Sequence, residues 1–196
     1  MVQLVSGVGH WVNMTGQAVG VTTLQLIRAV SAIANGGILY QPRIVRSITI
    51  DGKQTIPSVE PPRRVIGATT AATMRHLMEG VVLGGTGRKA QLDGYTTAGK
   101  TGTAQKIDPE THRYSRRNYM ASFIGYAPIN NPAVVTLVVL DSPHKGSHEG
   151  GWAAAPVFKR VMEQVLNYLG VPRDLPVQPT TETAALRIPA TGRRKV

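Results

Sequence analysis

The strongest periodic pattern in the chain lies between residues 22 and 37. One mostly apolar face repeats there at helical spacing and consists of Leu24, Leu26, Ile27, Val30, Ser31, Ile33 and Ala34. Thr22 or Thr23 can cap the start of such a helix, and Asn35-Gly36-Gly37 supplies a left-handed stop. The pattern therefore predicts a buried helix over residues 22–35.

A β-rich stretch and a second helix are predicted next along the chain. Residues 38–50 are rich in strand formers and lead into Asp51-Gly52, a pair typical of two-residue hairpin turns. A helix is predicted over Thr69–Leu83, because Gly84 and Gly85 supply its stop.

Three stretches in the middle of the chain predict an antiparallel meander. The threonine-rich segment 95–107 is typical of a strand and is followed by a polar loop over 108–118. Residues 119–126 and 133–140 predict two more strands, joined by a turn rich in proline and asparagine at 128–132. Because 133–140 is apolar almost throughout, we expect it in the sheet interior with both faces covered.

A last helix is predicted over residues 154–169, with Pro156 tolerated in its first turn and Gly170 at its end. Its predicted apolar stripe contains Val157, Phe158, Val161, Val165, Leu166 and Leu169. Beyond it, proline, threonine and arginine dominate. We therefore expect a folded unit over 1–171 and a disordered basic tail over 172–196.

Composition agrees with a folded domain and narrows its chemistry. The chain has 196 residues, of which 42% are hydrophobic and 17% charged, and it contains no cysteine, which excludes disulfides and thiolate metal sites. No apolar run approaches the roughly 20 residues that cross a bilayer, and the first residues lack the features of a signal peptide. We expect no membrane segment in this chain.

The net charge of +11 would suit an anionic partner, but its distribution argues against nucleic acid. Many of the basic residues lie in the predicted tail or in the predicted loop after residue 107. There is no basic helix, no zinc-finger spacing and no aromatic ladder. We therefore expect no nucleic-acid partner.

One short stretch, GYTTAGKT at Gly94–Thr101, fits two incompatible motifs. It matches the phosphate loop G-x-x-x-x-G-K-[ST], and with Gly102 it also contains K-T-G, a signature of the serine enzymes that penicillin acylates. A phosphate loop needs a buried strand before it and a helix beginning at its lysine. Here the preceding LGGTGRKAQLD is polar, and the glycine after Thr101 does not favour a helix. The flanks favour the strand.

In an extended strand, Lys100 projects on one side, while Thr101 and Thr103 carry hydroxyls on the other. Gly102 between them presents bare backbone, as glycine does where another chain approaches a strand. Such an edge can take an extended peptide by main-chain pairing and recognise a carboxylate at its end. A threonine-rich edge strand with a solubilising lysine also explains these residues.

Four segments resemble the C-terminal part of the transpeptidase domain of class B penicillin-binding proteins, most closely the septal cell-division type. They are GQAVGVTTLQLIRAVSAIANGG from Gly16, AGKTGTAQK from Ala98, SFIGYAPINNPAVVTLVVLDSP from Ser122, and GGWAAAPVFKRVMEQVLNYLGV from Gly150. The resemblance implies an α+β fold, with a central antiparallel sheet flanked by helices as in penicillin-binding proteins and β-lactamases.

The resemblance also implies an activity and its partners. A serine of the family attacks a peptidoglycan stem peptide, the amine of a second stem takes the acyl group, and β-lactams trap the same serine. Such enzymes act in the cell envelope, at the outer face of the cytoplasmic membrane, with other cell-division membrane proteins. No metal, nucleotide or organic cofactor is implied.

Matching the K-T-G motif residue by residue gives roles to four positions. Lys100 and Thr101 would hold the active-site proton network and the carboxylate of substrate or drug. Thr103 would offer its side chain to that carboxylate and its backbone N–H to the oxyanion hole, and Gly102 would keep the strand surface open. The expected catalytic residues are Lys100 and Thr103, and the expected substrate-binding residues are Lys100, Thr101, Gly102 and Thr103.

The chain departs from the family in its other two motifs. S-x-x-K and S-x-N precede K-T-G in the family, yet neither occurs here before Lys100, and S-x-N occurs nowhere in the chain. The one S-x-x-K, at Ser142–Lys145, is followed by Gly146 and is predicted to lie in a loop. The first two strands of the family's sheet also come from upstream sequence. We therefore expect a C-terminal portion without its nucleophile, inactive alone.

Other interpretations stay open on the sequence. The chain could be a non-catalytic module for wall binding or scaffolding, descended from the same fold. His144, His148 and Glu149 have a metal-like spacing, but the glycine and serine among them favour a loop, so no metal site is expected. Trp152 could line the rim of a cleft or pack in the interior.

Overall fold

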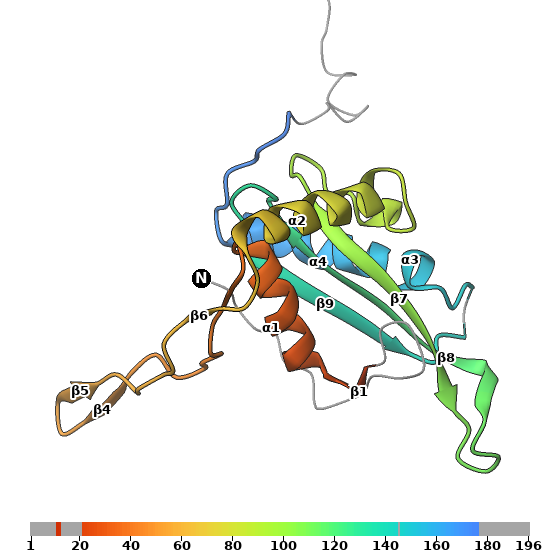
Figure 1. Ribbon diagram of the computed structural model, residues 1–196, viewed down its shortest axis with the longest axis horizontal. Coiled ribbons are helices and arrows are strands. Elements are labelled where there is room, and N and C mark those ends of the chain that lie inside the picture. Colours follow the sequence, from red (N-terminus) through yellow and green to blue (C-terminus); the bar gives the residue numbers. More distant parts are fainter. Residues whose placement is uncertain (1–10, 13–20, 145, 177–196) are drawn as a thin grey trace, which may run out of the picture.

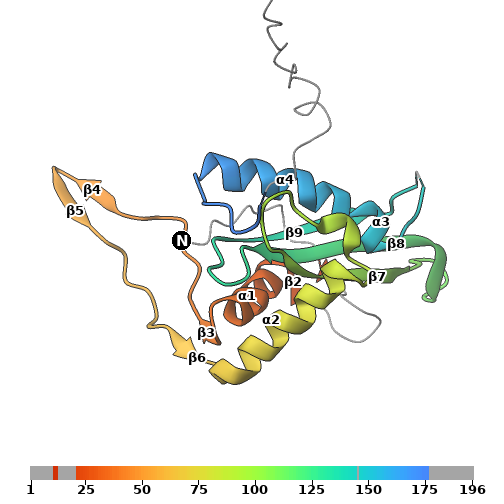
Figure 2. The same cartoon turned by 90° about the horizontal axis from the view of Figure 1, so that it is seen from above.

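The computed structural model describes residues 11–12, 21–144 and 146–176. Its centre is an antiparallel sheet in the order β7-β8-β9, formed by Ala98–Ile107, Tyr114–Ala127 and Val134–Asp141. Helices cover both faces of this sheet: α1 (Thr23–Ala34) and α2 (Ala68–Leu83) lie on one side, and α3 (Gly150–Ala153) and α4 (Ala155–Tyr168) on the other (Figures 1 and 2). The expected α+β class is confirmed.

Helix α1 begins and ends where the sequence predicts. The Thr22 side chain accepts a hydrogen bond from the Gln25 backbone N–H, and the Gln25 side chain accepts one from the Thr22 N–H, which completes a capping box. Gly36 and Gly37 follow with positive φ angles of 83° and 100°. The predicted face is shifted, however, because Leu24 is 42% exposed whereas Ala32 is buried.

The predicted positions of helices α2 and α4 are also confirmed. The apolar stripe predicted to be buried in α4 is partly wrong. The buried residues of α4 are Ala155, Phe158, Met162 and Leu166. Val161 and Leu169 are exposed, because the buried set follows steps of three and four from Ala155 and faces the sheet. The sequence prediction missed Met162 and the separate short helix α3.

The meander is confirmed, with two corrections. Strand β8 begins at Tyr114, which pairs with Ile107 of β7. The loop between these two strands is therefore shorter than predicted. Strand β9 is not interior: β8 is the central strand, and β9 forms an edge of the sheet in the described residues. Both faces of β9 are covered as expected, by α1 on one side and α4 on the other.

The two faces of the sheet bury two clusters of side chains. Phe123 faces α4 and packs against Phe158, with ring centroids 4.7 Å apart. Ile124 and Tyr126 belong to the second cluster, which includes Ile27 of α1. Burial raises the pKa of Tyr126, whose hydroxyl has no hydrogen-bond partner in the described structure.

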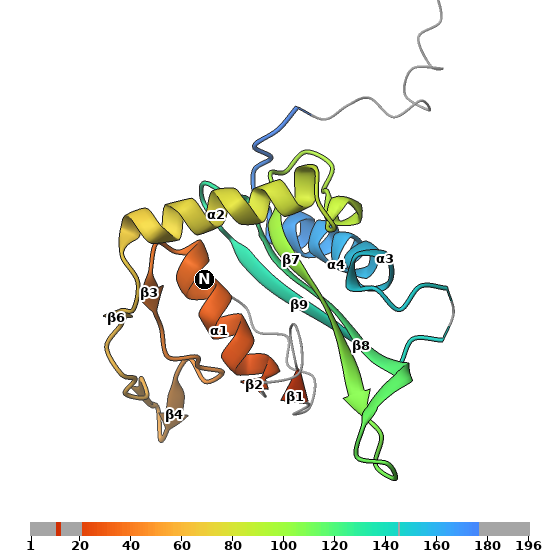
Figure 3. The same ribbon diagram turned by 45° about the vertical axis from the view of Figure 1, so that its right-hand side comes forward.

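A long excursion between α1 and α2 projects from the body (Figures 1 and 3). Its ends pair as β3 (Ile38–Leu39) and β6 (Arg63–Arg64), and its outer part forms the hairpin β4 (Ile48–Ile50) and β5 (Lys53–Thr55). The hairpin turns at Asp51 and Gly52, both with positive φ, which confirms the predicted turn. A further short pair joins β1 (Trp11–Val12) to β2 (Val21–Thr22).

The first residues after α4 return to the start of β7. Asp174 accepts hydrogen bonds from the backbone N–H and the hydroxyl of Thr96, and the Leu175 N–H donates to Gly94 O at 3.1 Å. Residues 177–196 of the predicted tail lie outside the described residues. Across the described part of the chain, no helix combines the length and apolar character needed to cross a membrane.

Candidate active site

The K-T-G residues lie inside strand β7, as the strand interpretation predicts. Lys100 pairs with Ile124, Gly102 with Ser122 and Thr103 with Ala121 of β8. The phosphate-loop alternative is wrong, because Lys100 and Thr101 are strand residues and the segment begins no helix. In an extended strand, the backbone N–H groups do not converge on one point, so they cannot surround a phosphate.

Side chains alternate along β7 and separate the lysine from the two threonines. The Thr101 hydroxyl is 2.8 Å from the hydroxyl of Thr86, and Thr103 Oγ1 accepts a hydrogen bond from the Gly150 N–H at 3.1 Å. Lys100 projects to the other face, and its Nζ donates to Thr101 O at 2.9 Å. The structure therefore brings both threonines to one side of the strand.

The backbone of the same residues points to the open edge of β7. Thr101 O accepts from Lys100 Nζ, which places this carbonyl on the edge away from β8. The N–H and C=O of one strand residue point to the same edge, and residues two apart share that direction. The N–H of Thr103 therefore faces outward beside its own hydroxyl.

Two glycines allow α3 to close over β7. A Cβ at Gly150 would collide with the carbonyls of Ser122 and Gly102, and a Cβ at Gly151 would collide with the carbonyl of Thr86. Only glycine permits this close approach of backbone to backbone. Gly150 thus sets the distance between α3 and the K-T-G strand, and Gly151 sets the distance between α3 and the segment after α2.

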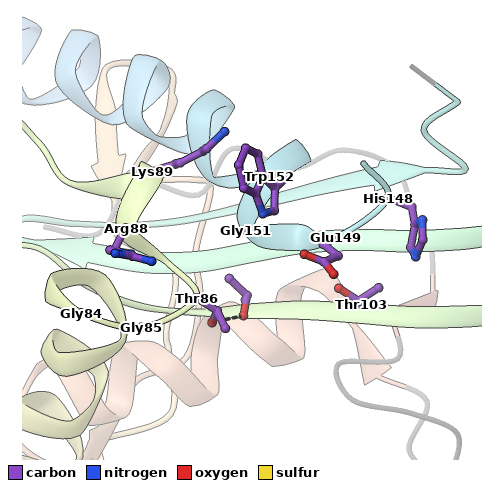
Figure 4. A pocket seen from close by; sticks show the side chains of 11 residues that line it. Gly84, Gly85, Thr86, Arg88, Lys89, Thr103, His148, Glu149, Gly151 and Trp152 are labelled. Atoms are coloured by element: carbon purple, nitrogen blue, oxygen red, sulfur yellow. Dashed lines mark hydrogen bonds between the residues drawn. The ribbon is translucent and has the colours of Figure 1, made fainter. Parts of the chain in front are cut away.

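A pocket of about 870 Å³ lies between β7, the segment after α2 and α3 (Figure 4). Thr101 and Thr103 line it from the strand, and Glu149 lines it from the segment before α3. The short 3-10 helix η1 (Arg88–Ala90) contributes Arg88 and Lys89. Sequence reasoning missed Thr86, Arg88 and Lys89, because it treated GGTGRK only as a polar flank.

The rim of the pocket settles the open interpretation of Trp152. Trp152 is 60% exposed and lines the pocket, with Lys89 Nζ 3.4 Å from its ring centroid, so it is not an interior residue. His148 stacks on Tyr119, with centroids 4.0 Å apart. Within residues 11–12, 21–144 and 146–176, no three His, Asp or Glu side chains are grouped to hold a metal ion.

The family model described as "Penicillin binding protein transpeptidase domain" matches residues 7–163. This chain belongs to that family. Among curated relatives, Stage V sporulation protein D of Bacillus subtilis is 42% identical over 159 residues, which cover 80% of this chain and 24% of the relative. The probable peptidoglycan D,D-transpeptidase PenA of Neisseria flavescens is 36% identical over 176 residues, covering 89% and 40% respectively.

A solved structure of a penicillin binding protein shows the same fold. Penicillin binding protein 3 from Mycobacterium tuberculosis, complexed with aztreonam, is 36% identical with a TM-score of 0.73. The match covers 84% of this chain and 39% of that chain. The matched part of the chain thus corresponds to well under half the length of each of these three relatives.

The S-x-x-K match does not have the setting of a transpeptidase nucleophile. Ser142 lies in a loop directly after β9 with a φ of 47°, and its hydroxyl donates to Asp141 Oδ1 at 2.7 Å. In an S-x-x-K nucleophile motif, the lysine reaches the serine from one helical turn away, and no helix begins at Ser142. The predicted loop is confirmed for Ser142–His144, while Lys145 lies outside the described residues.

Besides the pocket at β7, a groove runs along the open edge of β9. It has a volume of about 540 Å³ and is lined by six consecutive strand residues, Val134–Val139. Ile27 of α1 borders it on one face of the sheet, and Val161 and Val165 of α4 border it on the other. The groove is therefore a gap in the middle layer of the fold, between two layers of helices.

Proposed function

We propose that this chain is the K-T-G half of a peptidoglycan D,D-transpeptidase, a serine acyltransferase of the cell wall. One observation carries the proposal: the hydroxyls of Thr101 and Thr103 face one pocket, beside an outward N–H at the edge of the same strand. An extended peptide that paired with this edge would bring its C-terminal carboxylate to the hydroxyls.

Each strand residue has a role in this proposal. In acylation, a serine attacks the carbonyl of the penultimate D-alanine, and the outward Thr103 N–H donates to the oxyanion that forms. Thr101 and Thr103 hold the carboxylate of the leaving D-alanine, or of a β-lactam. Lys100, whose Nζ donates to the outward Thr101 carbonyl, belongs to the network that passes the serine proton to the leaving amine. Gly102 leaves room for the peptide backbone.

In this proposal, the nucleophilic serine lies in the part of the transpeptidase domain that precedes the segment matched by this chain. The match covers only 24% and 40% of two relatives, and neither S-x-x-K nor S-x-N precedes Lys100 here. The groove along β9 supports the same conclusion, because its position suits the sheet strands that the family takes from upstream sequence. The chain alone is therefore inactive, and the assembled enzyme acts in the cell envelope together with cell-division proteins.

Labelling with fluorescent penicillin tests this function. The 196-residue chain should give no covalent band, whereas a chimera that adds the preceding transpeptidase sequence of the Mycobacterium tuberculosis protein should be labelled. In the chimera, Lys100→Ala should slow labelling by about 100-fold, since it removes a proton-transfer group. Lys53→Ala, on the projecting hairpin, is the matched control and should label normally.

The outcome that would contradict the proposal is a folded chimera whose labelling is the same with and without Lys100. Thermal melting of each variant separates loss of fold from loss of function. Labelling of the chain by itself, abolished by Ser142→Ala, would instead show that the loop after β9 holds the nucleophile.

A further inference from the structure

The pocket beside the K-T-G strand holds more positive charge than the family motif accounts for. A carboxylate that leaves water for a site lined by hydroxyls loses hydration, and a charged donor offsets this loss far better than a neutral one. Lys100 lies on the opposite side of the strand and donates to Thr101 O. The cations on the threonine side are Arg88 and Lys89 of η1.

These two cations differ in what they already contact. The ammonium of Lys89 lies over the ring of Trp152, at 3.4 Å from its centroid. Arg88 is exposed and takes part in none of the ion pairs found among the described residues. A guanidinium presents a planar fork of donors that matches both oxygens of a carboxylate. Arg88 is therefore the cation of this pocket that is available for a ligand.

The acidic residue of the pocket indicates where an anion would lie. Glu149 lies at the Thr103 end, whereas Arg88 lies at the end near Thr86 (Figure 4). Thr86 in turn contacts the Thr101 hydroxyl. A carboxylate is repelled by Glu149 and attracted by Arg88, so the field of the pocket moves it toward Thr101.

We propose that Arg88 is a further substrate-binding residue, whose guanidinium pairs with the C-terminal carboxylate that Thr101 and Thr103 hydrogen-bond. This inference rests on the proposed function, because it concerns the same carboxylate. Arg88 selects the free acid of the peptide and takes no part in the acyl transfer itself.

The emission of Trp152 provides the test, because this ring lines the pocket. Trp11, the other of the two tryptophans, is replaced by phenylalanine, and the chain is titrated with N-acetyl-D-alanyl-D-alanine and with its C-terminal amide. Arg88→Gln should weaken binding of the acid about tenfold, the size expected for one charge-assisted pair, and leave binding of the amide unchanged. Arg88→Lys should lose less, since it keeps the charge.

Two controls separate this inference from the proposed function. Arg43→Gln removes the same charge from an exposed site on the projecting arm and should change neither affinity. If the unsubstituted chain prefers the acid and Thr103→Val weakens that preference, but Arg88→Gln leaves it intact, Arg88 has no such role. If the unsubstituted chain does not distinguish acid from amide, the proposed carboxylate site fails, and the role of Arg88 fails with it.

Discussion

The sheet has two outer strands, and their free edges differ in chemistry. The edge of β7 presents Lys100, the Thr101 carbonyl and the Thr103 N–H, beside a pocket lined by hydroxyls and charges. The edge of β9 presents Val134–Val139 in an apolar groove between α1 and α4. Among the described residues, neither edge has a further strand beside it.

The difference shows what each edge is suited to meet. The polar groups at the edge of β7 can form hydrogen bonds with water, and a ligand that forms equally good hydrogen bonds can replace that water. Apolar surface at β9 costs roughly 25 cal/mol per Å² while it is in contact with water, so covering it with protein is favourable. We therefore propose that β7 binds the ligand and that further protein completes the fold at β9.

The close approach of α3 to β7 should be the most sensitive feature of the ligand edge. Gly150→Ala places a Cβ against two backbone carbonyls that cannot move aside, and we expect a loss of about 2–3 kcal/mol in unfolding free energy. Gly80→Ala, in α2 with open space around it, should instead stabilise by about 0.5–1 kcal/mol. Urea unfolding measures both, and equal effects would contradict the close packing at α3.

The edge of β9 should make the isolated chain associate with itself. A lysine at Val139 opposes edge pairing, so Val139→Lys should weaken self-association about tenfold. Ile50→Lys, on the exposed hairpin, serves as the control and should have little effect. Sedimentation velocity over a range of concentrations measures the self-association. If Ile50→Lys weakened it more than Val139→Lys, the self-association interface would lie on the hairpin and not on β9.

Removing the Thr103 hydroxyl should affect both the fold and the ligand. Thr103→Val leaves the Gly150 N–H without its acceptor, and we expect a loss of about 1 kcal/mol in stability. Binding of N-acetyl-D-alanyl-D-alanine should weaken as well. Calorimetric melting gives the first quantity and fluorescence titration the second; unchanged peptide binding in a folded variant would remove Thr103 from the site.

The smallest expected change concerns Glu149. Its carboxylate lines the pocket and repels a bound carboxylate, so Glu149→Gln should tighten binding of the peptide acid about twofold. Binding of the peptide amide should not change, because the amide carries no charge. Weaker binding of the acid would mean that Glu149 contacts the peptide favourably.

Much of the fold follows from local patterns in the sequence. The capping residues and glycine stop define α1, and Asp51-Gly52 defines the hairpin turn. The alternation in β7 correctly separates Lys100 from the two threonines. These features depend on neighbours within a few residues, which is why sequence alone predicts them.

The misses involve contacts between distant segments. Strand order is not encoded in hydrophobicity: we expect the apolar β9 in the sheet interior, whereas among the described residues β8 is the central strand and β9 has a free edge. Thr86 and Arg88 join the site only because the segment after α2 folds back over β7. Their local sequence has no pattern of its own, and only the structure shows that Thr86 contacts Thr101 and that Arg88 lines the same pocket.

The most direct test of the contrast between the two edges is an amide chemical-shift titration of the chain with N-acetyl-D-alanyl-D-alanine. We predict that the largest shifts fall on Gly102, Thr103 and their neighbours in β7, and that Val134–Asp141 remains unperturbed. Shifts concentrated on β9, or absent from Thr103 at saturating peptide, would contradict it.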